Sequence, residues 1–197
     1  MTETKEKKSA FLLGTTFKNI DFTTSFTDKN IDDVTFDRCD FSGITFKNCS
    51  IQACNFYACN LNNTIFENCE IGSNFSFSRM HGADLSGCNI SSSDFSYVTM
   101  SGAKFNGAQI IYGNFKCAEM SDVDFTDLYI SESYLGSADM NEKVIQIGPF
   151  KEERLVTYFA YRDMICLDGN QGKHLTISKL RDKNPILADI LIAAAKL

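Results

Sequence analysis

The chain has 197 residues, of which 44% are hydrophobic and 22% are charged, a composition typical of one folded domain of medium size. Its net charge of −6 argues against nonspecific binding to nucleic acid. No apolar run approaches the roughly 20 residues that span a bilayer, and no apolar segment follows the charged start. We therefore expect no membrane span, no secretory signal, and a cytoplasmic protein with reduced thiols.

A bulky apolar residue recurs every five positions from about residue 12 to residue 140, with four-residue steps at 22–26 and 71–75. Thirteen of the 17 phenylalanines occupy these central positions. The residue two places before the centre is usually small, and the residue just before it is usually polar. Because a period of five matches neither a strand nor a helix, the pattern indicates neither a plain sheet nor a helical array.

Five segments carry a resemblance to a known family: CDFSG (39–43), CNLNN (59–63), ADLSG (83–87), CNISS (88–92) and AKFNG (103–107). They resemble pentapeptide repeats of the A(D/N)LXX kind. The resemblance implies an all-β fold, a right-handed quadrilateral β-helix with four pentapeptides in each of about six coils. We predict a disordered charged tail at 1–10, the β-helix at 11–140 and a C-terminal cap at 141–197.

A coil of four pentapeptides predicts columns of residues about 20 positions apart. One column is isoleucine throughout: Ile31, Ile51, Ile71, Ile90, Ile110 and Ile130. The next is mainly phenylalanine: Phe36, Phe56, Phe75, Phe95 and Phe115. A third ends in methionine: Met80, Met100, Met120 and Met140. Such uniform columns are expected where side chains of adjacent coils touch, and each buried centre should contribute about 1.5–3 kcal/mol.

The C-terminal cap is predicted to be a small α/β unit, because the five-residue period ends at residue 141. Short strands are predicted at 145–150, 156–161, 164–167 and 174–177. Asn184 before Pro185 predicts the start of a terminal helix. This helix is apolar on most sides, which makes four of its residues a candidate homodimer interface: Ile186, Leu187, Ile190 and Leu191. Gyrase-protecting pentapeptide-repeat proteins, which this layout resembles, are implied to dimerise through such a helix.

No motif for catalysis or metal binding occurs in the sequence. It has no C-x2-C pair, no G-x-S-x-G and no glycine-rich phosphate loop, and its two histidines have no partner motif. Five cysteines occupy the small position before a centre and are interpreted as buried filler: Cys39, Cys49, Cys54, Cys59 and Cys69. We therefore expect a non-enzymatic protein without catalytic residues, bound metal or cofactor.

Acidic residues concentrate in the last coil. Residues 119–140 contain six acids and no base, whereas residues 41–118 contain four of each. The six are Glu119, Asp122, Asp124, Asp127, Glu132 and Asp139. One interpretation is a solvated rim that prevents end-to-end stacking of rods. The other is a partner-binding acidic patch.

The resemblance implies an acidic rod that occupies the DNA-binding groove of another protein. Duplex DNA carries one charge per ~1.7 Å, so a rod roughly 30 Å long would need about 18 negative charges to match it. Residues 17–140 have a net charge of −9, about half that density. The leading hypothesis is a protein-interaction rod that binds or protects a DNA-handling enzyme such as DNA gyrase, a topoisomerase. The alternative is a scaffold or effector whose protein partner binds a rod face or the cap.

Overall fold

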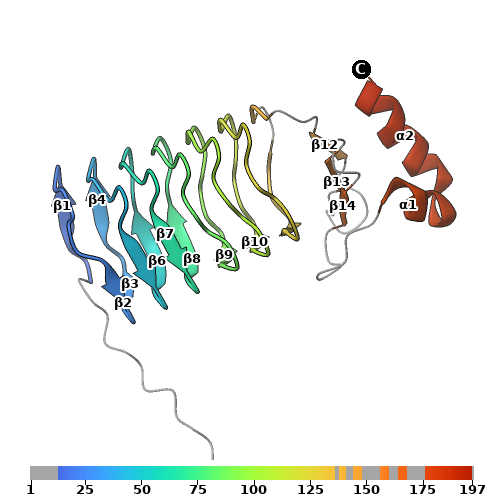
Figure 1. Ribbon diagram of the computed structural model, residues 1–197. Helices are drawn as coiled ribbons and strands as arrows, with labels where there is room; N and C mark the ends of the chain where they lie inside the picture. Colours follow the sequence, from blue (N-terminus) through green and yellow to red (C-terminus); the bar gives the residue numbers. More distant parts are fainter. Residues whose placement is uncertain are drawn as a thin grey trace, which may run out of the picture.

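The computed structural model describes residues 13–135, 138–140, 144–147, 156–159, 164–167 and 176–196. Strands β1 to β11 stack along one axis as a rod, strands β12 to β14 stand beside its C-terminal end, and helices α1 and α2 lie beyond them (Figure 1). The tail expected at 1–10 lies outside the described residues.

The strands of the rod are short because each side of a coil holds a single pentapeptide. They are β1 (Thr16–Lys18), β2 (Phe26–Thr27), β3 (Asn30–Asp32), β4 (Thr35–Asp37), β5 (Thr45–Lys47), β6 (Ser50–Asn55), β7 (Ile65–Glu67), β8 (Glu70–Asn74), β9 (Asn89–Ser91), β10 (Gln109–Ile111) and β11 (Tyr129–Ser131). Their pairs are parallel and join residues 19 or 20 positions apart in neighbouring coils. The rod is therefore the β-helix of about six coils that the period of five predicts.

The corners of the rod explain the five-residue period. At the corners between five-residue steps, the residue two places after a centre adopts the left-handed region, with φ between 49° and 71°, whereas the four-residue steps at 22–26 and 71–75 have no such residue. Glycine enters this region freely, and asparagine and aspartate enter it more readily than other residues. Gly102, Gly107, Asn63 and Asn68 follow this rule. A five-residue side of the square tube thus consists of a short extended stretch and one left-handed turn.

Like side chains stack on like inside the rod. The isoleucines pair in register from Ile31 and Ile51 at one end to Ile110 and Ile130 at the other. The rings from Phe36 to Phe115 stack with centroids 4.8–5.1 Å apart. Met80, Met100 and Met120 are fully buried, and Met140 is partly buried against the same core. The four-residue step at 71–75 keeps the columns aligned.

The C-terminal cap begins with an antiparallel sheet of β12 (Val144–Ile147), β13 (Val156–Phe159) and β14 (Met164–Leu167), in which β13 is central. Phe159 is fully buried and its ring centroid lies 5.6 Å from that of Phe125. It joins the core cluster of the rod, so this sheet covers the open end of the last coil.

Two helices complete the cap. The prediction of a strand at 174–177 is wrong for its described residues, because Thr176 is the N-cap of α1 (Ile177–Lys183) and its hydroxyl accepts the Lys179 N–H. Helix α2 (Pro185–Lys196) begins where the Asn-Pro pair predicts, and Asn184 Oδ1 accepts the Leu187 N–H at 3.1 Å. An ion pair of 2.7 Å between Arg181 and Asp189 links the two helices.

Candidate interaction surfaces

The six acids of the last coil form a band around the rod and not a patch on one side. Asp122, Asp127 and Glu132 occupy successive corners, with φ of 57°, 53° and 49°. Glu119 and Asp139 are bridge partners on a flat side. Successive pentapeptides point to successive sides, so acids that are close in sequence spread around the circumference. We call Glu119, Asp122, Asp124, Asp127, Glu132 and Asp139 the acidic band.

Two lysines of the middle coils pair with acids along the rod axis. Lys47 Nζ lies 2.6 Å from Glu67 Oε1, exactly one coil of 20 residues away in the chain. Lys104 Nζ lies 3.8 Å from Asp84 Oδ2, and Lys104 is also the bridge partner of Asp124. The last coil has no base of its own in the sequence. The acidic band therefore has a net negative charge, whereas the middle of the rod is neutral.

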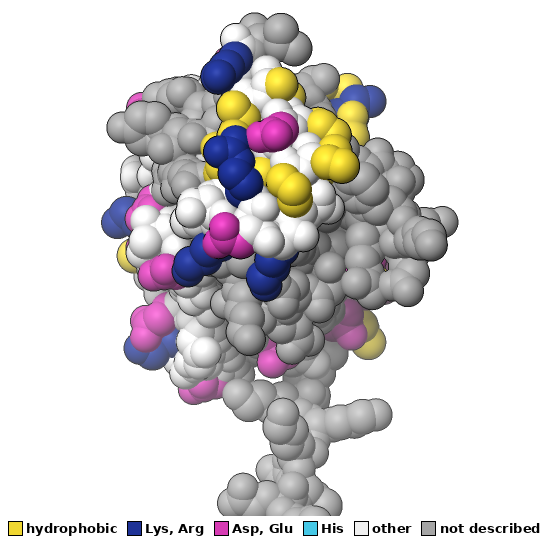
Figure 2. Space-filling model, turned by 90° about the vertical axis from the view of Figure 1, so that its right-hand side faces the viewer, with side chains coloured by type: hydrophobic (Ala, Val, Ile, Leu, Met, Phe, Trp, Pro, Cys, Tyr) yellow, Lys and Arg dark blue, Asp and Glu magenta, His cyan; other side chains and the backbone are white. Residues whose placement is uncertain are grey.

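The structure divides the candidate dimer interface into two halves. Ile186 is 74% exposed and Ile190 is 48% exposed, whereas Leu191 is fully buried. Leu187 is partly buried and packs with Leu191 against the apolar core of the cap. Leu187 and Leu191 are thus removed from the candidate interface, because the helical period turns them toward the cap. Figure 2 shows hydrophobic side chains gathered at this end of the molecule.

The cysteines at the small inward positions are buried. The Cys59 thiol, 1% exposed, lies 3.2 Å from the Phe36 carbonyl oxygen, and burial raises its pKa to about 12. Burial also raises the pKa of Cys39 and Cys54. These thiols remain protonated and fill space, as the sequence suggests. Cys117, at a corner with φ of 54°, is half-buried.

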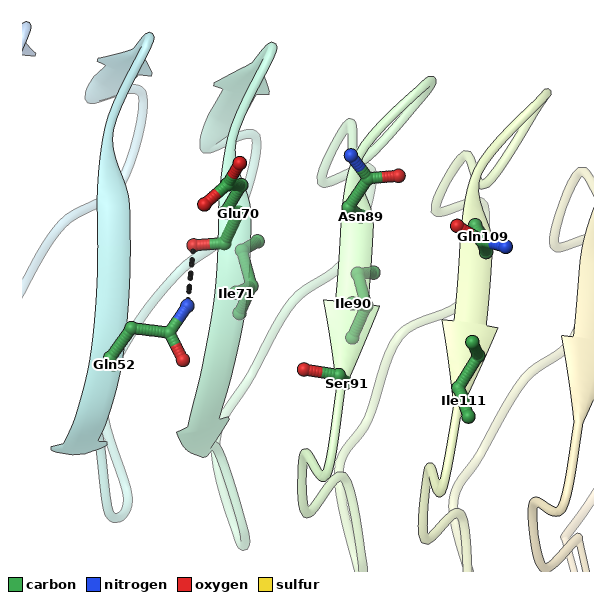
Figure 3. Close-up of a pocket in the computed structure, with 8 residues that line it drawn as sticks. All are labelled: Gln52, Glu70, Ile71, Asn89, Ile90, Ser91, Gln109 and Ile111. Carbon is green, nitrogen blue, oxygen red and sulfur yellow. Dashed lines mark hydrogen bonds between the residues drawn. The ribbon is translucent and has the colours of Figure 1, made fainter. Parts of the chain in front are cut away.

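A shallow hollow of about 180 Å³ opens on the isoleucine side, across strands β6, β8, β9 and β10 (Figure 3). Gly72 leaves room for the Gln52 amide at this hollow, because a Cβ at Gly72 would lie only 2.3 Å from Gln52 Oε1. Gln52 Nε2 donates to the Glu70 carbonyl oxygen at 3.2 Å across this space. Amides, one carboxylate and a serine hydroxyl line the hollow, and Ile111 borders it. These groups can form hydrogen bonds with a ligand, but none of the residues that line the hollow is a buried acid or base that could act on that ligand.

One row of exposed aromatic rings follows a corner of the rod. The ring centroids of Tyr57 and Phe77 are 5.6 Å apart, and those of Phe77 and Tyr97 are 4.8 Å apart with planes 8° from parallel. The three residues are 41%, 52% and 44% exposed. We call Tyr57, Phe77 and Tyr97 the aromatic stripe. The sequence interpretation missed it because it assigned aromatic residues to the centres. The available signal was an aromatic residue just after a centre, one place after Phe56 for Tyr57 and two places after the centre for Phe77 and Tyr97.

The described residues hold no group of three or more His, Cys, Asp or Glu side chains placed to bind a metal ion. Helices long and apolar enough to cross a membrane are likewise missing from the part of the chain that the structure describes. His81, which the sequence places at a turn, is exposed, and its N–H donates to Asn62 Oδ1 at 2.9 Å.

Stacked coils of four five-residue sides define a β-solenoid built from pentapeptides. The family model for pentapeptide repeats matches in eight copies, over residues 30–69, 71–107 and 88–127. The chain belongs to the pentapeptide-repeat family. Comparison with curated protein sequences gave no match.

Several solved structures are similar in part. The plasmid-mediated fluoroquinolone resistance protein QnrB1 has 17% identity and a TM-score of 0.33, covering 66% of this chain and 92% of that one. A pentapeptide repeat protein from the Arabidopsis thaliana thylakoid lumen has 16% identity and a TM-score of 0.32, covering 50% and 66%. Rfr23 from the cyanobacterium Cyanothece 51142 has 12% identity and a TM-score of 0.31, covering 66% and 86%.

Proposed function

We propose that this protein is a non-enzymatic interaction rod whose acidic band binds a basic surface of a DNA-handling enzyme, with DNA gyrase as the first candidate. The observation that carries the proposal is the band itself: six acids without a base in the last coil, beside middle coils of balanced charge. A band of negative charge near one end of a rigid rod attracts a positively charged surface of a partner and orients that partner.

The shape of the band defines the kind of contact that we propose. Its acids face several sides of the rod next to the cap, so a partner groove can engage some of them by gripping the rod from the side. A lengthwise DNA-like contact would need charge along the whole rod, and residues 41–118 have no net charge. The proposed mimicry of DNA is therefore confined to the last coil.

Inhibition of supercoiling by purified DNA gyrase tests this proposal. The band variant carries Asp122→Asn and Asp127→Asn. The matched control carries Asp28→Asn and Asp33→Asn, which removes the same charge from corners of similar φ at the other end of the rod. We expect inhibition by the wild-type protein at micromolar concentration, a roughly tenfold loss in the band variant, and a change below about twofold in the control.

Three results would contradict the proposal. If the wild-type protein leaves supercoiling unchanged at tens of micromolar, gyrase is not the partner. If the band and control variants lose inhibition equally, inhibition depends on the net charge of the protein and not on the position of the acids in the band. Inhibition that does not weaken between about 50 and 200 mM salt would also count against an electrostatic contact.

A second candidate function is a scaffold that pairs with another copy of itself through the cap. The exposed Ile186 and Ile190 favour it, since they lie one turn apart on α2. Sedimentation should then show a dimer at tens of micromolar for the wild-type protein and a monomer for Ile186→Lys with Ile190→Lys. A wild-type monomer at that concentration would reject this dimer.

A further inference from the structure

Two of the three stripe residues, Phe77 and Tyr97, occupy a position that folding disfavours in two ways. Phe77 and Tyr97 have φ of 60° and 57°, and bulky residues in this region cost about 1 kcal/mol or more. Both rings also leave about half of their surface in water. At the same corner in the first coil the chain has Asn19, also with positive φ. The rod therefore accepts asparagine at this corner, and its stability does not explain the aromatic residues.

Backbone hydrogen bonds show that the stripe follows the axis of the rod. The Phe77 N–H donates to the Ser96 carbonyl oxygen at 3.1 Å, and the Tyr97 N–H donates to the Lys116 carbonyl oxygen at 2.9 Å. Successive rings of the stripe thus belong to successive coils. The centroid spacings of 5.6 and 4.8 Å bracket the 5.4 Å pitch of an α-helix.

Two cations flank the stripe without a close ion pair among the described residues. Arg79 follows Phe77 by two residues, and Lys116 lies one coil beyond Ser96 and Tyr97. Both side chains are exposed, and no carboxylate of the described residues lies within 4.0 Å of either charge. They differ in this from Lys47 and Lys104, which pair along the rod.

The nearby acids are already held by the rod. Both oxygens of Asp40 accept the Asn60 amide at 3.0 Å, and Oδ1 accepts the Ser42 N–H. Burial alone would raise the pKa of Asp40, but these hydrogen bonds and the charge of Arg79 lower it. Asp94 Oδ1 likewise accepts the Asn114 amide at 3.0 Å. Glu119 is an exposed acid two coils beyond Arg79, because Thr99 bridges both residues. The charge beside Phe77 is therefore cationic, and the row that begins with Arg79 ends in an acid.

We propose that the aromatic stripe binds an amphipathic helix of another protein, one with an apolar side chain on each turn and acidic residues beside them. A helix parallel to the rod axis presents one apolar side chain per 5.4 Å turn, so successive turns pack against successive rings. Its carboxylates reach Arg79 on one side and Lys116 at the end. The inference deepens the proposed interaction role, on which it rests, but it does not use the acidic band.

A designed peptide serves as the probe. It has about 20 residues, enough for a helix of several turns, with leucine at i, i+4, i+7 and i+11, glutamate beside the leucines and a fluorescein label. Fluorescence anisotropy should show saturable binding to the full chain below about 1 mM. Phe77→Asn with Tyr97→Asn should weaken binding about tenfold or more. Arg79→Gln with Lys116→Gln should weaken it by a smaller factor and reduce its dependence on salt.

Matched variants separate binding from folding. Tyr112→Asn changes another exposed aromatic residue at a positive-φ corner, 55% exposed, and should leave peptide binding unchanged. The midpoint of urea unfolding of Phe77→Asn with Tyr97→Asn should equal or exceed that of the wild-type chain, because asparagine suits the corner. Asp122→Asn with Asp127→Asn should also bind the peptide normally, which keeps this test apart from the gyrase test.

Four results would overturn the inference. They are the absence of saturable binding, equal affinity for a peptide with lysine in place of glutamate, equal affinity in the Phe77→Asn, Tyr97→Asn variant, and equal affinity for a peptide broken by a central proline. A further outcome is self-association of the wild-type chain that this double variant abolishes. That outcome would assign the stripe to a second copy of the chain and reject the helical partner.

Discussion

The centres and the corners of the rod use the same residue types under different constraints. Phe75 and Phe77 are two positions apart, yet Phe75 is fully buried and Phe77 is 52% exposed. The same holds for Phe95 and Tyr97. A centre must fill a column of fixed width, so its shape is dictated by the coils on either side. A corner requires only a left-handed backbone. A residue that adopts this conformation unfavourably therefore indicates that the corner has a role other than folding.

Truncation of one interior ring should change the free energy of unfolding most. It is therefore the most direct test of the difference between centres and corners. Phe95→Ala removes a ring stacked between Phe75 and Phe115, at 5.1 and 5.0 Å. It should lower the free energy of unfolding by about 3–5 kcal/mol, since the rigid columns cannot collapse into the space. Tyr97→Ala, at the neighbouring corner, should change it by less than about 0.5 kcal/mol. Urea unfolding measures both; comparable losses would mean that corners contribute to the core.

Cysteine allows a sharper comparison, because the same side chain occurs at both kinds of position. Iodoacetamide followed by mass spectrometry should modify Cys117 at a corner in the folded state and leave Cys59 unmodified. Burial raises the pKa of Cys59 to about 12, so this thiol supplies almost no thiolate at pH 8. Rapid modification of Cys59 in native conditions would show that the coils open on the time scale of the reaction.

The raised pKa of Cys59 also links stability to pH. The folded rod holds this proton more tightly than the unfolded chain, whose thiol titrates near about 8.5. The stabilising contribution is therefore complete below that pH and is lost as the pH rises toward about 12. Cys59→Ala should unfold at lower urea concentration at every pH, yet its midpoint should fall less steeply than that of the wild-type chain between pH 8.5 and 11. Parallel slopes would exclude Cys59 as a source of alkaline instability.

The interior could be predicted from sequence because it is periodic. Each coil repeats the previous one, so the spacing of 20 residues alone predicts that Ile51 lies on Ile71, and the register places it there. The placement of the acidic residues follows from the same repeat. A five-residue repeat turns to a new side with each pentapeptide, so Asp122, Asp127 and Glu132 occupy successive corners. Whether the band is a solvated rim or a partner-binding surface stays a prediction.

Features outside the repeat were harder to predict. Apolarity alone did not show that Leu187 and Leu191 face the cap while Ile186 and Ile190 face outward, because that depends on the sheet beside α2. Helix α1 was missed, since its start depends on the single hydrogen bond between Thr176 and Lys179. The aromatic stripe was missed because the sequence analysis searched for apolar residues at the centres and did not consider those at the corners. Periodicity thus specifies the scaffold, and the candidate surfaces lie where single residues depart from it.

Thr99 offers the smallest test, at a position that is neither a centre nor a corner. It lies on a flat side between its bridge partners Arg79 and Glu119, and its hydroxyl oxygen is buried without a hydrogen-bond partner among the described residues. Leaving such a group unsatisfied costs about 1–3 kcal/mol, so Thr99→Val, which keeps the shape, should raise the free energy of unfolding by about 1 kcal/mol. Thr64 is the matched control, because its buried hydroxyl donates to the Phe41 carbonyl oxygen at 2.9 Å and Thr64→Val should destabilise the rod by a similar amount. The urea midpoints of the two variants should therefore shift in opposite directions. A shift in the same direction would show that these hydroxyls affect stability through packing and not through hydrogen bonding, as side chains at the centres do.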